Sequence, residues 1–486
     1  MASNPNDSAH ATSNAGTDAP EPRSDGGVIY APWERAFDRV MTPFDEFIHR
    51  QTTGGLPLML TAIVALVLAN SPLASTYHHL IELPLGVGVG DLRLEKSLHH
   101  WVNDGLMALF FFLVGMELKR EFLVGELADL RQAALPLFAA IGGMLVPAAI
   151  YTLVNPEGIA ARGWGIPMAT DIAFAVGALA LLAARVPTSL ITFLVALAIV
   201  DDLGAVMVIA IFYTSDLVVA WLAVAGGLVL LLAALNLLGV RKTLPYLLVA
   251  IALWVALLQS GVHATLAGVI GAFSVPTRPR YDPVAFGARL ARMFGRYDEA
   301  RRTDPNVLTN EDLRSVLQGL ENGVVAAQTP LQRLEHFWHL PVAFLVVPIF
   351  ALFNAGIPLD AATLAGALGH PVTMGVVLGL VVGKFVGITG FSWLALRLGI
   401  ATLPRGTRFS QVASVSLLAG IGFTMSIFIA ELGFANAPEY LLMAKTGILM
   451  ASVLSGSLGF ALLWYLGRGK ATAIEAADAQ QAPAGT

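Results

Sequence analysis

Long apolar runs separated by short polar connections recur along most of the chain. Their length approaches the ~20 residues that a helix needs to cross the hydrocarbon core of a bilayer. Several runs are short or contain Gly and Pro. The pattern predicts an all-α polytopic membrane protein with twelve transmembrane segments, at about 55–73, 98–118, 133–154, 165–183, 188–213, 217–238, 243–259, 261–275, 337–354, 372–397, 409–432 and 439–465.

The two ends of the chain lack such runs. Residues 1–32 are rich in small and polar residues and have no apolar core, which predicts a disordered tail and excludes a signal peptide. A second disordered tail is predicted for 467–486, after a transmembrane domain at 54–466. Aromatic and apolar residues recur at helical spacing in 33–50. That spacing predicts an amphipathic helix on the inner membrane surface, or alternatively a short soluble helix.

Two connections show a pattern of their own. Apolar residues alternate in 85–96 on both sides of Gly90 and Asp91, which predicts a small external β-hairpin. The connection 276–336 is much longer than the others and is predicted to be cytoplasmic. Within it, Asn310 is a candidate N-cap for a helix that carries Leu313 and Leu317 on one face.

Composition and charge support a membrane protein. Of the 486 residues, 56% are hydrophobic and 13% are charged, whereas a soluble domain has about a quarter charged. The net charge of −5 does not indicate binding to nucleic acid. The lack of cysteine excludes disulfides, zinc thiolate sites and thiol catalysis. With the N-terminus in the cytoplasm, nine basic residues fall in short internal connections and three in external ones. This bias predicts that both termini are cytoplasmic.

Three aspartates and one lysine stand out among the charged residues inside predicted spans, namely Asp171, Asp201, Asp202 and Lys384. A charge at the bilayer centre costs about 2.5–3.5 kcal/mol and usually marks an ion or proton pathway. The adjacent residues Asp201 and Asp202 point about 100° apart on a helix, so one can face water while the other pairs with Lys384. A purely structural ion pair is the alternative, but three aspartates and one lysine leave negative charge uncompensated.

The chemistry of these residues favours exchange of small cations. Carboxylate, hydroxyl and carbonyl oxygens are the ligands that hard cations such as Na⁺ and Li⁺ prefer. Clustered buried carboxylates also take up protons in coupled steps. A site that holds either a cation or protons, and that opens to each side in turn, is sufficient for exchange.

Two predicted spans contain helix-breaking residues at matching places. Pro167 and Thr170 precede Asp171 in the fourth span, and Gly420 and Gly422 interrupt the eleventh. Broken helices in corresponding halves indicate a transporter site and an inverted repeat, here of spans three to five and ten to twelve. Asp171 is placed to balance the positive end of a half-helix, and Lys384 the negative end.

Ionisable residues also gather near the inner ends of spans two and nine. Histidine titrates near neutral pH, so these residues form a candidate cytoplasmic pH sensor. A solvated rim is the alternative for them, and the lone His263 is more typical of a packed, hydrogen-bonded histidine. The candidate pH-sensing residues are Glu117, Lys119, Arg120, Glu121, Glu335, His336, His339 and His263.

Five motifs closely resemble those of the bacterial NhaA-type sodium/proton antiporters. They are WVND at 101–104, ATDIAF at 169–174, ALAIVDDLGA at 196–205, SGVHATLAG at 260–268 and GIGFTMSIF at 420–428. The similarity runs from about residue 54 to 465, with the motifs in order. It implies twelve spans, of which the fourth and eleventh are discontinuous and cross at the midplane.

The resemblance also implies roles for the charged residues. Asp202 and Asp201 would bind Na⁺ or Li⁺ and protons, with Thr170 and Asp171 nearby. Lys384 would pair with Asp201 when sodium is absent. The exchange would be electrogenic, with one cytoplasmic Na⁺ leaving for more than one external proton, and it would be activated at alkaline pH through the two clusters described above.

Further expectations concern the setting of the protein. The resemblance implies a secondary active transporter of the bacterial inner membrane, rather than an enzyme, in contact with membrane lipid. It needs no cofactor and binds no nucleic acid, and it would form a homodimer through the hairpin at 85–96. The longer N-terminal region and the expanded 276–336 loop depart from the family form, which puts the pH threshold in doubt but not the transport chemistry.

Two other classes of protein use membrane aspartates. An intramembrane aspartyl protease has a Gly-x-Gly-Asp motif, but the match at 88–91 lies in the external hairpin. A passive cation channel needs a ring of acidic side chains or a repeated filter, and neither is evident in the sequence. A buried Lys384 would also oppose cation flow.

Overall fold

The structure is a computed structural model of the 486-residue chain. It describes residues 55–89, 92–183, 185–214, 217–279 and 283–481. The chain divides into two units, 1–50 and 51–486, and the first lies outside the described residues. The predicted N-terminal tail at 1–32 and surface helix at 33–50 are therefore not described.

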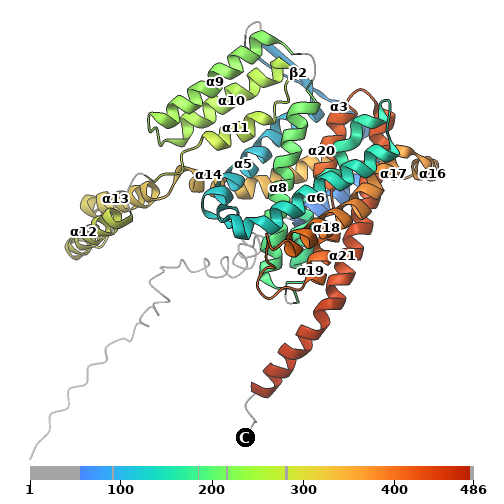
Figure 1. Cartoon of the computed structure of the whole chain (residues 1–486). Coiled ribbons are helices and arrows are strands. Elements are labelled where there is room, and N and C mark those ends of the chain that lie inside the picture. The colour runs from blue at the N-terminus through green and yellow to red at the C-terminus, as the bar shows by residue number, and fades with distance from the viewer. Residues whose placement is uncertain (1–54, 90–91, 184, 215–216, 280–282, 482–486) are drawn as a thin grey trace, which may run out of the picture. The chain divides into compact units, whose positions relative to one another are not determined.

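Helices make up nearly all of the described elements (Figure 1), which confirms the predicted all-α class. Three of them, η1, η4 and η5, are π-helical, and η2 and η3 are 3₁₀-helical. The helices are α2 Gly55–Ala69, α3 Ala74–Glu82, α4 Leu98–His100, η1 Trp101–Leu106, α5 Met107–Val124, η2 Glu126–Ala128, α6 Leu130–Val154, η3 Ala160–Met168, α7 Ile172–Ala180, α8 Thr188–Phe212, α9 Val219–Leu237, α10 Thr243–Ser260, α11 Leu266–Ser274, α12 Pro283–Thr303, α13 Glu311–Ala327, α14 Pro330–Pro341, η4 Val342–Val346, α15 Val347–Asn354, α16 Ala361–Gly369, α17 Pro371–Leu378, η5 Gly379–Gly383, α18 Lys384–Arg397, α19 Phe409–Leu418, α20 Phe423–Gly433 and α21 Pro438–Gln481.

Described helices overlap each of the twelve predicted spans, but not every span is complete. Within the described residues, nine helical segments are long and apolar enough to cross a membrane, or eleven when each of two bent pairs counts as one span. One of the nine, 160–180, is counted across the gap between η3 and α7. The bent pairs are α2 with α3, at 113°, and α19 with α20, at 48°. The predicted span at 261–275 contains only α11, whose nine residues are too short to cross a bilayer alone.

The hairpin predicted at 85–96 is confirmed, while its external location stays a prediction. Strand β1, Pro84–Val89, pairs antiparallel with β2, Leu92–Ser97, with Val89 opposite Leu92 and Pro84 opposite Ser97. The end of the bundle from which this hairpin projects is called the hairpin face below, and the other end is called the opposite face. Because β2 leads directly into α4, the start of α5 is fixed at the hairpin face.

The long connection between α11 and α14 folds into two helices, α12 and α13. Asn310 caps α13, because its side-chain oxygen accepts the N–H of Leu313 at 2.9 Å, as predicted. Asp304 shapes the turn before it, accepting the Thr309 hydroxyl at 2.6 Å and the Asn306 N–H at 2.9 Å. These hydrogen bonds lower the pKa of Asp304, the Thr309 hydroxyl most of all. Helix α12 was not predicted, although Phe286, Leu290, Met293 and Phe294 recur in it at helical spacing.

The last helix extends beyond the predicted membrane segment. Helix α21 continues to Gln481, into the region 467–486 that the sequence predicts as a disordered tail. Residues 468–481 are rich in Ala, a strong helix former, which favours continuation of the helix.

The two largest of three apolar clusters hold most of the described helices together. The larger cluster surrounds α7, α8, α19 and α20 and therefore encloses the two broken segments. The smaller one joins α9, α10 and α11, which lie together in Figure 1. Helices α6 and α18 approach closely at Gly142 and Gly387, where a Cβ on either residue would collide with the carbonyl oxygen of the other. Small residues at such contacts let membrane helices pack backbone to backbone.

Candidate functional site

The site is built around two interrupted helices. The first interruption lies between η3 and α7 at residues 169–171, after Pro167, and the second lies between α19 and α20. The two breaks touch, because the Asp171 N–H donates to the Ile421 carbonyl at 2.7 Å. Backbone groups that a continuous helix would pair internally are thus satisfied across the crossing.

Asp171 caps both half-helices that begin at the crossing. One carboxylate oxygen accepts the Phe174 N–H of α7 at 3.0 Å. The other accepts the Thr424 N–H of α20 at 2.9 Å and also the Thr424 hydroxyl. A carboxylate is stabilised at helix N-termini by the unpaired N–H groups and the helix dipole. Asp171, only 2% exposed, therefore holds two positive helix ends together.

Thr170, Asp201 and Lys384 form one buried polar group, and each of the three is 0% exposed. The Lys384 ammonium forms an ion pair with Asp201 Oδ2 and lies 3.0 Å from the Thr170 hydroxyl. That hydroxyl is 2.8 Å from Asp201 Oδ2 and 2.9 Å from the Ala419 carbonyl at the end of α19. The expectation that Lys384 would balance a helix C-terminus is not met by these contacts, since Thr170 is the residue that reaches the α19 carbonyl.

Asp202, unlike Asp201, has no hydrogen-bond or ion-pair partner among the described residues. It is 0% exposed, and neither of its carboxylate oxygens has a hydrogen-bond partner among the described residues. Asp201 Oδ1 also lacks one within that part of the chain. Asp201, Asp171, Lys384 and Glu117 are all within electrostatic reach of Asp202. Burying an unpartnered carboxylate is costly, so these oxygens are suited to a proton or a cation.

The structure brings together some of the predicted site residues and separates others. Thr170, Asp201 and Lys384 contact each other, whereas Asp171 contacts the α20 N-terminus instead. No group of three or more His, Asp or Glu residues that could hold a metal ion occurs in the described ranges. A cation at this site would therefore need hydroxyl or carbonyl oxygens in addition to the carboxylates.

Thr424 is a site residue that the sequence analysis did not select. It follows the break at Gly420 and Gly422 and donates twice to Asp171. Its position at the start of a half-helix, directly after a glycine pair, is the signal that could have identified it.

The candidate pH-sensing residues are only partly assembled. On the opposite face, Arg120 pairs with Glu335 at 2.7 Å and with Glu121 at 3.1 Å, which joins α5 to α14. Glu117 and His339 lie within electrostatic reach of Arg120. His336 lines a hollow of about 860 Å³ between α10 and α14.

Two further candidates lie apart from that group. Lys119 donates to the carbonyls of Phe273 and Val275, at 2.6 and 2.5 Å, and so binds the C-terminal end of α11. His263 lies 2.5 Å from the Tyr213 carbonyl through Nε2. That contact is the packed, hydrogen-bonded arrangement typical of a lone histidine.

Comparison with known proteins decides the family. Residues 45–463 match the family described as Na⁺/H⁺ antiporter 1. The chain belongs to the Na⁺/H⁺ antiporter 1 family. The match covers the spans described above up to residue 463, including both broken helices and the buried charged residues around them.

The similarity to individual relatives extends over nearly the whole length of those relatives. The Na⁺/H⁺ antiporter NhaA 1 of Saccharophagus degradans is 56% identical over 435 residues, covering 90% of this chain and 94% of the relative. The Na⁺/H⁺ antiporter NhaA of Sulfurimonas denitrificans is 50% identical over 440 residues, covering 90% and 99%. The one from Acidithiobacillus ferrooxidans is 50% identical over 435 residues, covering 89% and 99%.

Proposed function

We propose that this protein exchanges Na⁺ or Li⁺ for protons at Asp202 and Asp201, by alternating access from the two faces. Membership of the antiporter family supports the exchange itself. The observation that carries the assignment to these residues is the buried Asp202 carboxylate, which has no hydrogen-bond partner among the described residues. Such a group binds whichever of a proton or a cation reaches it.

Lys384 provides the competition that couples the two ions. Its ammonium now neutralises Asp201 through a buried ion pair, with Thr170 completing the contact. A cation that binds both carboxylates would weaken this pair, and loss of the cation would restore it. A proton and a cation need the same carboxylate oxygens of Asp201 and Asp202, so binding of one excludes the other. Exchange requires this competition.

We further propose that the hairpin face is external and that both termini are cytoplasmic in a bacterial inner membrane, as the distribution of basic residues favours. In this orientation one cytoplasmic Na⁺ leaves for more than one external proton, so transport is electrogenic and secondary active. The Arg120–Glu335 contact lies at the cytoplasmic face, where a pH sensor would act. Pairing of two hairpins is the proposed homodimer contact.

The test uses everted membrane vesicles with a preset pH gradient. Addition of Na⁺ or Li⁺ should dissipate the gradient for the wild type and fail to do so for Asp202→Asn, which keeps the size of the side chain. Full exchange by Asp202→Asn would refute the assignment of this residue. Sodium flux without coupled proton movement would instead favour a passive cation channel.

A further inference from the structure

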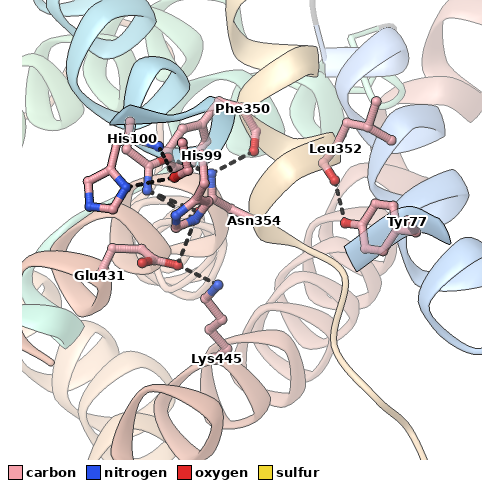
Figure 2. Close-up of polar contacts among 10 residues, drawn as sticks. Tyr77, His99, His100, Phe350, Leu352, Asn354, Glu431 and Lys445 are labelled. Atoms are coloured by element: carbon pink, nitrogen blue, oxygen red, sulfur yellow. Dashed lines mark hydrogen bonds and ion pairs between the residues drawn. The ribbon is translucent and has the colours of Figure 1, made fainter. Parts of the chain in front are cut away.

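A second polar cluster lies at the hairpin face, away from the exchange site (Figure 2). Its centre is Glu431, on the last turns of α20. The same carboxylate oxygen, Oε1, lies 2.5 Å from Lys445 Nζ on α21 and 3.4 Å from His99 Nε2 on α4. The carboxylate is therefore shared by two basic groups from two other elements.

Amides extend this cluster to α15. His99 Nε2 is 3.0 Å from Asn354 Oδ1, and Asn354 Nδ2 donates to Asn103 Oδ1 at 2.8 Å and to the Phe350 carbonyl at 3.0 Å. Figure 2 shows Asn354 between the α15 backbone and His99. Side chains thus join five elements from three regions of the sequence, namely α4 with η1, α15, and α20 with α21.

The cluster lies at the boundary between the bundle and its surroundings. The side chain of Glu431 is 9% exposed, that of Lys445 15% and that of His99 23%. His100 and Asp104 lie within electrostatic reach of His99, and Lys96 lies within reach of both of them. The ion pair is enclosed enough to hold the helices and near enough to the surface to be broken by water.

Glu431 is linked to the exchange site through one short helix. Thr424, seven residues earlier on α20, donates its N–H and hydroxyl to Asp171. Seven helical residues span about 10.5 Å, so the half-helix carries the Asp171 contact at one end and the Lys445 contact near the other. The Glu431 contacts tie this half-helix to α21 and α4 in this structure.

We propose that Glu431, Lys445 and His99 form the gate that closes the hairpin face of the exchange site. In this structure the gate is closed. It opens when Glu431 separates from Lys445 and α20 moves away from α21. Glu431 is accordingly a positioning residue, acting through the N-terminus of α20 on Asp171. The inference rests on the alternating access proposed above.

The first experiment uses cross-linking, because the chain has no cysteine of its own. In Glu431→Cys/Lys445→Cys, a cleavable bifunctional thiol reagent would join α20 to α21. Each single variant treated with the same reagent is the control. Exchange in proteoliposomes should stop on cross-linking and return on cleavage if the gate must open. Exchange at the untreated rate in fully cross-linked protein would mean that the contact is a static brace, and would overturn the proposal.

The second experiment measures the affinity at each face. Glu431→Gln should lower the KM for Na⁺ at the hairpin face about 5-fold, the effect of roughly 1 kcal/mol on the closed state. The KM at the opposite face should change less, because the closed state still predominates. Lys445→Gln should shift the KM in the same direction but by less, because the His99 contact to Glu431 remains. The double variant should resemble Glu431→Gln, since no carboxylate is then left for Lys445 or His99 to hold. Glu439→Gln, an exposed position on α21, is the matched control.

The outcomes separate this proposal from the one before it. Glu431→Gln could melt at a lower temperature than the wild type while its KM for Na⁺ stays at the wild-type value at each face. That result would leave only a structural role for Glu431. Normal exchange by the wild type in the same preparation shows that such a result concerns the gate alone. Failure of the exchange proposal would instead appear as full activity of Asp202→Asn.

Discussion

The buried pair of Lys384 and Asp201 offers the sharpest test of how the charged residues are held. Both side chains are 0% exposed, and Lys384 contacts Asp201 and Thr170. Lys384→Met removes the ammonium while keeping a long, flexible, apolar side chain in its place. The Asp201 carboxylate would then remain buried with the Thr170 hydroxyl as its remaining described partner.

The expected cost follows from the burial of both charges. Removing one partner of a fully buried ion pair destabilises a protein by about 3–5 kcal/mol, because the other charge stays desolvated and uncompensated. Replacing both partners with neutral groups is often nearly neutral. Lys384→Met should therefore lose about 3–5 kcal/mol, whereas Lys384→Met/Asp201→Asn should recover most of that loss.

The assay is thermal unfolding of purified protein in detergent, together with exchange across a range of pH. The single variant should melt several degrees below the wild type, and the double variant close to it. The destabilisation should be smaller at acidic pH, because a proton on Asp201 removes the uncompensated charge. The pH profile of any remaining exchange should shift as well.

Two results would refute the reasoning. An unchanged melting temperature and pH profile for Lys384→Met would mean that the pair carries no net interaction. Equal destabilisation of the single and double variants would mean that the loss comes from the lysine's packing, not from the orphaned carboxylate. Lys242, an exposed lysine at the N-terminus of α10, provides the control substitution Lys242→Met.

Three further predictions test other parts of the structure. Thr424→Val, which removes one hydrogen bond to the Asp171 carboxylate, should cost about 1.5–3 kcal/mol in unfolding experiments, and no loss would argue against this contact. Gly387→Val should disrupt the packing of α6 on α18 and lower the melting temperature, whereas Gly390→Ala, with open space around its Cβ, should not. Replacement of 278–328 by a short Gly-Ser linker should leave the KM for Na⁺ unchanged. The two ends of this segment already meet, because the Leu331 N–H donates to the Pro276 carbonyl at 3.2 Å. A higher KM would assign residues 278–328 a role in transport.

Local sequence features were sufficient for most of the secondary structure. Apolar runs located the membrane segments except the one at 261–275, where only the short helix α11 forms. Alternation located the β-hairpin, and Asn310 marked the start of α13. These features depend on residues within a few positions of each other, so they can be read from one stretch of chain. Helix α12 carries a comparable signal that the sequence analysis did not use, with Phe286, Leu290 and Phe294 four residues apart on one face.

The breaks in the fourth and eleventh spans were also visible in the sequence, because Pro167 and the glycines at 420 and 422 cannot continue a regular helix without cost. What occupies those breaks was not visible. That Thr424 donates to Asp171, across 253 positions of the chain, depends on how the two broken helices cross.

The sequence by itself determined that this is a polytopic helical membrane protein with costly charges inside it, because hydrophobic length and the expense of buried charge are properties of composition. Only the tertiary structure decided how those charges are distributed. It paired Lys384 with Asp201 across 183 positions, left Asp202 without a hydrogen-bond partner among the described residues, and placed Glu431 between Lys445 and His99. Partners so distant in the chain are selected by helix packing, which no local pattern encodes.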